Sequence, residues 1–157
     1  MIREDIYLAL QAQLQGINKV LTTDQAPVVT WGRRLPAADD LGSINQPAVY
    51  VITSGEHRKP VRGFPDVVTL KADVWIFCNV GGDMHAVPVN QINYLLDALD
   101  AAVAPDPVTR FQTLGGLVSH CWIEGDVIID EGLFQGQSFA IVPFMILVPH
   151  LMESPHG

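Results

Sequence analysis

The sequence predicts an α+β domain in which a mostly antiparallel β-sheet has two main helices packed on one face and extends into a projecting β-hairpin arm. Residues 67–78 alternate apolar and polar side chains, which is the period of a strand with one buried face. Residues 2–21 and 89–103 instead repeat apolar side chains every three or four positions, as a helix with one buried stripe does. Residues 54–66 form a long segment between two predicted strands, and this predicts the arm.

The N-terminal half begins with the first helical stripe. Gly16 lies inside it and should weaken or end the helix, because glycine costs about 1 kcal/mol relative to alanine. Residues 28–31 are short and β-branched and predict a strand, whereas residues 36–42 indicate an irregular connection. Residues 48–53 predict a further strand, which leads into the arm. The stripe consists of Ile2, Ile6, Leu10, Leu14, Ile17 and Leu21.

The C-terminal half begins where residues 79–82 break the central strand. Pro88 suits the first turn of the second helix, and Pro105 ends that helix. Pro143 lies in the middle of the last strand and predicts an edge position or a bulge, because proline cannot donate a ladder hydrogen bond. The remaining predicted strands are residues 117–123, 126–130 and 137–148.

Length and composition predict one domain over residues 1–150 and a flexible C-terminal tail over residues 151–157. Only 17% of the residues are charged and 48% are hydrophobic, so we expect a partner to cover part of the apolar surface. The acidic N-terminus does not resemble a signal peptide, and the longest apolar run is too short to span a bilayer, so no export and no membrane segment are expected. The two cysteines form no CxxC pair and fit a reducing cytosol.

Charge is distributed unevenly along the chain. The net charge is −8, and the segment from Asp97 onward has eight acidic residues and a single basic one, Arg110. This balance argues against general nucleic-acid binding, which needs an extended positive surface. The basic residues gather instead at Arg33, Arg34, Arg58, Lys59 and Arg62.

These five basic residues are the predicted assembly interface. A basic arm on one copy and an acidic surface on the next are complementary in a head-to-tail ring. A solvated loop, or a contact with a passing polyanion, is the alternative interpretation of Arg58, Lys59 and Arg62.

The candidate chemical groups predict no catalytic, cofactor-binding or metal site. His120 and Cys121 are adjacent and should point to opposite faces of a strand, which is poor geometry for one metal ion. A Cys–His nucleophile stays open, although both cysteines lie in apolar strands. Asp97 and Asp100 fit the solvated face of the second helix. The acidic residues Glu124, Asp126, Asp130 and Glu131 match a calcium loop only loosely and fit exposed turns better.

Six segments follow one another in a recognisable order, namely residues 6–10, 47–51, 74–77, 92–102, 119–125 and 140–149. Their order resembles that of the tail terminator proteins of long-tailed bacteriophages and the similar neck proteins of contractile and gene-transfer particles. The resemblance covers roughly residues 2–149 and is a pattern of segments without a sharp motif.

The resemblance implies a non-enzymatic virion protein without cofactors. Such proteins form a ring, usually of six copies, on the head-proximal end of the tail tube. The ring stops tube polymerisation and presents a surface to the head–tail connector or stopper protein, and DNA passes through its lumen. The implied location is the neck of the virion, after assembly in the host cytoplasm.

Two other functions stay open. One is a different assembly protein of the same particle, such as a head-closure ring or a minor tail component. The other is an enzyme or a binder of a small ligand or metal that uses His120, Cys121 or the acidic residues at positions 124–131.

Overall fold

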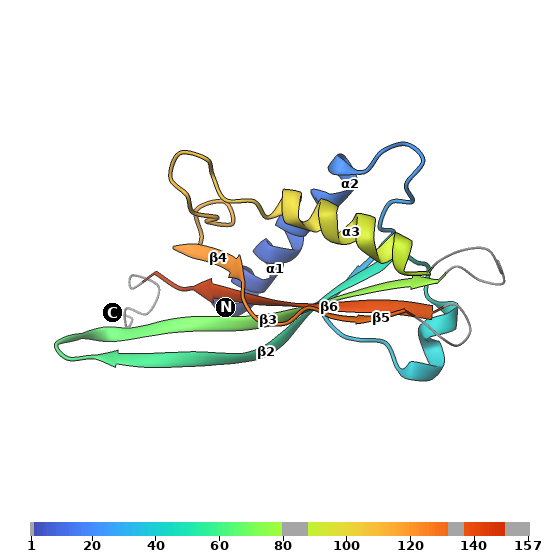
Figure 1. Cartoon of the computed structure of the whole chain (residues 1–157). Helices are drawn as coiled ribbons and strands as arrows, with labels where there is room; N and C mark the ends of the chain where they lie inside the picture. The colour runs from blue at the N-terminus through green and yellow to red at the C-terminus, as the bar shows by residue number, and fades with distance from the viewer. Residues whose placement is uncertain (1, 80–87, 132–136, 150–157) are drawn as a thin grey trace.

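The computed structural model describes residues 2–79, 88–131 and 137–149, and it confirms the α+β fold with a mostly antiparallel sheet. The α-helices lie together on one face of the sheet (Figure 1). The predicted tail at residues 151–157 and the predicted break at residues 80–82 lie outside the described residues. The elements are α1 (Ile2–Leu14), α2 (Ile17–Val20), β1 (Thr30–Gly32), the 3-10 helix η1 (Ala38–Ser43), β2 (Ala48–Val61), β3 (Phe64–Asn79), α3 (Pro88–Ala102), β4 (His120–Ile123), β5 (Ile128–Asp130) and β6 (Gln137–Leu147).

The sheet has the strand order β1-β2-β3-β6-β4, and β5 also pairs with β6. All pairs are antiparallel except β1 with β2. β4 pairs with β6 from Phe144 to Leu147, and β5 pairs with it from Phe139 to Ile141. The two short strands therefore follow one another along the same side of β6, with a break between them.

Pro143 lies at this break, and the prediction of an edge strand or a bulge is wrong. β6 is an inner strand, and its ladder with β3 runs without a register shift through the pair Asp73 and Pro143. The carbonyl of Pro143 accepts a hydrogen bond from the backbone N–H of Glu124 at 3.2 Å. The backbone N–H and C=O of a strand residue point to the same side. The proline nitrogen therefore faces the site where the neighbouring strand is interrupted, and no ladder bond is lost.

The main core lies between the sheet and the helices. The alternation in β3 is confirmed, because Leu70 and Val74 are buried whereas Lys71 and Asp73 are only half-buried. The first helical stripe is confirmed from Ile6 to Ile17, with the expected interruption at Gly16 between α1 and α2. Ile2 is instead 46% exposed, and Leu21 lies beyond the end of α2. The fully buried helical side chains at this interface are Ile6, Leu10, Leu14, Ile17, Ile92, Leu95 and Leu99.

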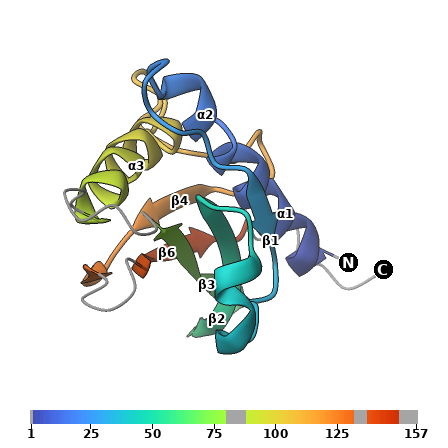
Figure 2. The same cartoon turned by 90° about the vertical axis from the view of Figure 1, so that its right-hand side faces the viewer.

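The opposite face of the sheet has a small aromatic cluster at one end. The ring of Trp75 lies 5.6 Å from that of Phe139 and 5.9 Å from that of Phe77. Leu41 and Ile44 pack against this cluster from η1 and its end. The irregular connection predicted over residues 36–42 thus contains a 3-10 helix, which lies on the face away from α1 and α3 (Figure 2).

Three predicted strands have different boundaries in the structure. The strand predicted over residues 28–31 is shifted to β1, and that over residues 126–130 is shortened to β5. The strand predicted over residues 117–123 begins only at His120, because the N–H of Val118 turns back to the carbonyl of Thr113 at 3.1 Å.

The hairpin arm is confirmed, and it is more regular than a loop. β2 and β3 continue as paired strands through the predicted arm segment and meet at Arg62 and Gly63. Gly63 has a φ of 81°, a conformation that suits glycine. The arm extends beyond the layer of helices (Figure 1).

Candidate assembly interface

The outer part of the arm, beyond the pair Arg58 and Val68, is a two-stranded ribbon, because the pairing of β3 with β6 ends at Thr69 and Leu147. All nine residues of β2 from Thr53 to Val61 are exposed, in contrast to the buried residues from Ala48 to Val51. An isolated two-stranded hairpin is only marginally stable in water. The arm therefore presents an ordered surface that a partner can cover.

A β-bulge at Ser54 sets which side chains lie on each side of the arm. Thr53 pairs with Ala72 and Gly55 pairs with Lys71, so Ser54 is an extra residue in β2. Beyond the bulge, Arg58 pairs with Val68, which belongs to the main core, and so lies on the helical side of the sheet. His57 and Lys59 alternate with it and lie on the other side.

Ion pairs connect the helical side of the arm to the N-terminus of α1. Arg3 binds Glu56 at 2.8 Å, and Arg58 binds the same carboxylate at 2.9 Å. Arg58 also lies 3.8 Å from Asp66. The hydrogen bond from Arg3, followed by that from Arg58, lowers the pKa of Glu56 below its ordinary value. The positive charge of Arg58 is therefore largely balanced within the arm.

The tip of the arm has charges that are not balanced. Within residues 2–79, 88–131 and 137–149, neither Lys59 nor Arg62 forms a salt bridge, and both side chains are exposed. Phe64 is 71% exposed at the same tip, beside Val61, with which it pairs across the turn. The tip thus combines two available cations with an exposed aromatic ring, as protein contact surfaces often do.

Arg33 has an internal role that its neighbour in sequence does not share. Its guanidinium donates to the carboxylate of Glu4 at 2.9 and 2.7 Å, and also to the carbonyl of Val51. It stacks over the ring of Tyr7 with 4.8 Å to the ring centroid. Arg34 is exposed and forms no salt bridge in the described ranges. The structure therefore places three of the five predicted interface residues on the arm and ties Arg33 to helix α1.

The edge of the sheet at β5 is the second exposed surface, and it was not found by sequence reasoning. Val127, Ile128 and Ile129 are 40, 55 and 43% exposed. β5 pairs only with β6 in the part of the chain that the structure describes. The sequence signal that could have indicated this edge is the run of three β-branched residues.

The acidic residues Glu124, Asp126, Asp130 and Glu131 flank this run. In the described ranges no cluster of acidic, His or Cys side chains could hold a metal ion.

Three of the groups considered for catalysis, Asp100, His120 and Cys121, line one open cavity of about 250 Å³. They do not form an activated Cys–His pair. Burial raises the pKa of the Cys78 and Cys121 thiols to about 12, so the nucleophilic thiolate is scarce at neutral pH. His120 stacks on Trp122 with 5.1 Å between ring centroids, and its Nδ1 accepts the N–H of Gln112 at 3.1 Å. His120 is half-buried whereas Cys121 points into the main core, as expected for neighbours in a strand. The carboxylates of Asp97 and Asp100 are exposed on α3.

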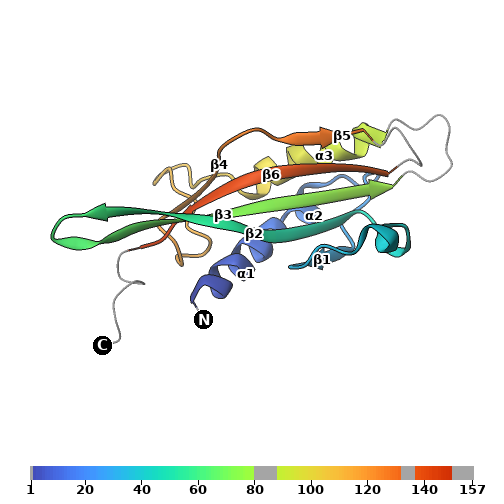
Figure 3. The same ribbon diagram turned by 90° about the horizontal axis from the view of Figure 1, so that it is seen from below.

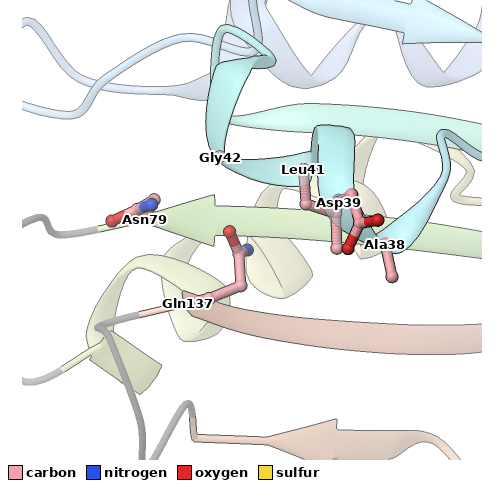
Figure 4. A pocket seen from close by; sticks show the side chains of 6 residues that line it. All are labelled: Ala38, Asp39, Leu41, Gly42, Asn79 and Gln137. Carbon is pink, nitrogen blue, oxygen red and sulfur yellow. The ribbon is translucent and has the colours of Figure 1, made fainter.

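A cavity of about 400 Å³ lies between η1 and the adjoining ends of β3 and β6 (Figure 4). The amide of Gln137 exchanges hydrogen bonds with that of Gln46 at 3.0 and 3.1 Å, so it is already engaged. The lining has one carboxylate and two amides, a set suited to hydrogen bonding and not to nucleophilic attack. The lining residues are Ala38, Asp39, Leu41, Gly42, Asn79 and Gln137.

No protein-family model matches the chain, and no curated protein matches it significantly. No helix in the described ranges is long and apolar enough to cross a membrane. The features that bear on function are therefore the segment pattern of the sequence, the arm and the β5 edge.

Proposed function

We propose that the chain is the subunit of a ring that caps the head-proximal end of a phage tail tube, ends tube polymerisation and joins the tail to the head connector. The observation that carries this proposal is the hairpin arm, in which nine successive residues of β2 are ordered yet exposed. The choice of a tail-capping ring as the specific assembly comes from the resemblance of the sequence to tail terminator proteins.

The arm supports an assembly role through its stability and its charge. A two-stranded ribbon gains stability when its exposed side chains are covered by another surface. Lys59 and Arg62 lie at the tip of a ribbon that belongs to a chain of net charge −8. Such opposite charges on different parts of one chain favour association between copies and increase its rate.

A contact between two different surfaces of the same chain is head-to-tail. Repetition of such a contact gives a closed ring when the rotation between copies closes, and a filament when it does not. The resemblance implies closure, usually with six copies, around a lumen through which DNA passes.

Light scattering at several protein and salt concentrations, together with electron microscopy, tests the ring. We expect a closed particle near six copies whose stability falls with added salt, because exposed charges are screened. The second step is to add the chain to polymerising tail tube protein from the same particle. Tubes that end at a cap of this protein are expected.

Two outcomes contradict the proposal. A chain that stays monomeric and leaves tube growth unlimited is not a terminator. Binding to the head connector without capping of tubes instead indicates a head-closure protein of the same particle.

A further inference from the structure

We propose that the β5 edge of one copy receives the hairpin arm of a second copy, which adds its β2 strand to the sheet beside Ile128. The inference rests on the proposed ring and names the contact that closes it.

The β5 edge has the chemistry of a strand-pairing site. Ile128 pairs with Ile141 and Ile129 pairs with Ala140, so their side chains lie on opposite faces of the sheet. Both are about half exposed, at 55 and 43%. An edge strand with adjacent exposed apolar residues is a template for pairing with another chain, and stable proteins usually cover such edges.

The arm offers a strand of matching length. β1 pairs with β2 only as far as Tyr50, so the outer edge of β2 is unpaired along the arm in the described structure. Pro60 has no N–H and limits regular pairing to the residues before it. The stretch from Gly55 to Lys59 is therefore available to a strand as short as β5.

Charge selects the arm as the occupant of this edge. Asp126 and Glu131 are exposed on the two flanks of β5, and Lys59 and Arg62 are exposed cations without a salt bridge in the described ranges. Pairing of β5 with a second β5 would bring acidic flanks together and is disfavoured by repulsion. Pairing with the arm brings opposite charges together.

The two surfaces of one chain are too far apart to meet each other. The arm leaves the sheet along the strand direction, whereas β5 lies on a long edge near the other end of β6 (Figure 3). The contact must therefore form between copies, and because it joins unlike surfaces it is head-to-tail.

Crosslinking between two cysteine variants tests this contact. Lys59→Cys and Asp126→Cys are purified separately, mixed, and treated with a short bismaleimide. The native cysteines give little background, because Cys78 and Cys121 are buried. We expect a linked dimer containing one chain of each variant in the mixture.

Each other result of the crosslinking overturns the inference. Dimers formed by Asp126→Cys alone indicate pairing of β5 with β5. If the sample is assembled but gives no mixed dimer, the proposed contact is contradicted and the proposed ring is not. If the wild-type chain is monomeric at every concentration, both the proposed contact and the proposed ring are contradicted.

Charge reversal gives an independent measurement. Two double variants are made: Lys59→Glu with Arg62→Glu, and Asp126→Lys with Glu131→Lys. Each should weaken self-association about tenfold in sedimentation or light scattering. A chain with all four substitutions should regain most of the wild-type affinity. The matched control is Lys19→Glu with Asp97→Lys, which reverses exposed charges on α2 and α3 and should change nothing. Failure of the fourfold variant to recover, with its fold intact by circular dichroism, contradicts the contact.

Discussion

Arg33 and Glu4 lie 29 residues apart in the chain, and their side chains form a two-pronged ion pair at 2.9 and 2.7 Å. The planar guanidinium matches the two carboxylate oxygens, a geometry that lysine cannot reproduce. The same guanidinium also donates to the carbonyl of Val51, so one side chain joins helix α1 to strand β2.

Substitution of Arg33 should therefore destabilise the fold. Arg33→Ala leaves the Val51 carbonyl without this donor and removes the stacking on Tyr7, and we expect it to lower the free energy of unfolding by about 1–2 kcal/mol. Arg33→Lys should recover only part of the loss. The control is Arg34→Ala, which should stay within about 0.5 kcal/mol of wild type because its side chain is exposed. Equal effects of Arg33→Ala and Arg34→Ala in urea unfolding would contradict the internal role.

The Glu4 carboxylate should make stability depend on acid pH. The hydrogen bond from Arg33 lowers the folded-state pKa of Glu4 below its ordinary value of 4.5. A lowered folded pKa contributes stability that is complete above the unfolded pKa and is lost as pH falls through the folded pKa.

A comparison of wild type with Glu4→Gln measures this contribution. We expect the wild type to be more stable near neutral pH, by less than about 1 kcal/mol because the pair is partly exposed. The difference should disappear as the pH falls well below 4.5, the ordinary value of this carboxyl. A difference that is unchanged across this pH range would assign the effect to packing.

The two cysteines should react slowly while the protein is folded. Cys78 and Cys121 are 0 and 2% exposed, and burial raises the pKa of both thiols to about 12. Ellman's reagent should therefore label neither thiol in the native protein on the timescale of seconds and both after addition of guanidinium. Rapid labelling of one thiol in the native state would show that the surrounding strands open.

Deletion of Ser54 should separate the fold from assembly. The deletion removes the bulge and leaves the pairs on either side of it, such as Gly55 with Lys71, free to form a regular ladder. A bulge increases the local twist of a strand, so its loss should change the direction of the arm. We expect the unfolding free energy to stay within about 1 kcal/mol of wild type and the ring to weaken in light scattering. Normal assembly of the deletion variant would mean that the direction of the arm is unimportant.

The regular helices and strands could be predicted because the spacing of their apolar residues follows which side chains are buried. The alternation in β3 and the part of the α1 stripe from Ile6 to Leu14 identify the buried side chains directly. By contrast, the parallel pairing of β1 with β2 and the ion pair of Arg33 with Glu4 depend on distant segments meeting in space. Local pattern contains no information about such contacts, so adjacent Arg33 and Arg34 seemed equivalent in the sequence.

The predictions for Pro143 and for residues 36–42 were wrong because local sequence does not show which strands and loops become neighbours in the fold. Pro143 was expected at an edge or a bulge because proline lacks a donor, but an inner strand accommodates it where the neighbouring strand is broken. The segment over residues 36–42 has the composition of a connection, and η1 is too short to give a helical period. The β5 edge was missed because its three apolar residues resemble core residues until the sheet order is known.

The exposed arm also has a consequence for protease sensitivity. Trypsin cleaves after lysine and arginine but poorly before proline, so the bonds after Arg58 and Arg62 are open to it and the bond between Lys59 and Pro60 resists it. Loop tips are preferred sites of such nicking. The free chain should be cut first at the arm, and a covered arm should be protected. The rate of tryptic cleavage within the arm therefore reports how many copies are assembled, without any label on the protein.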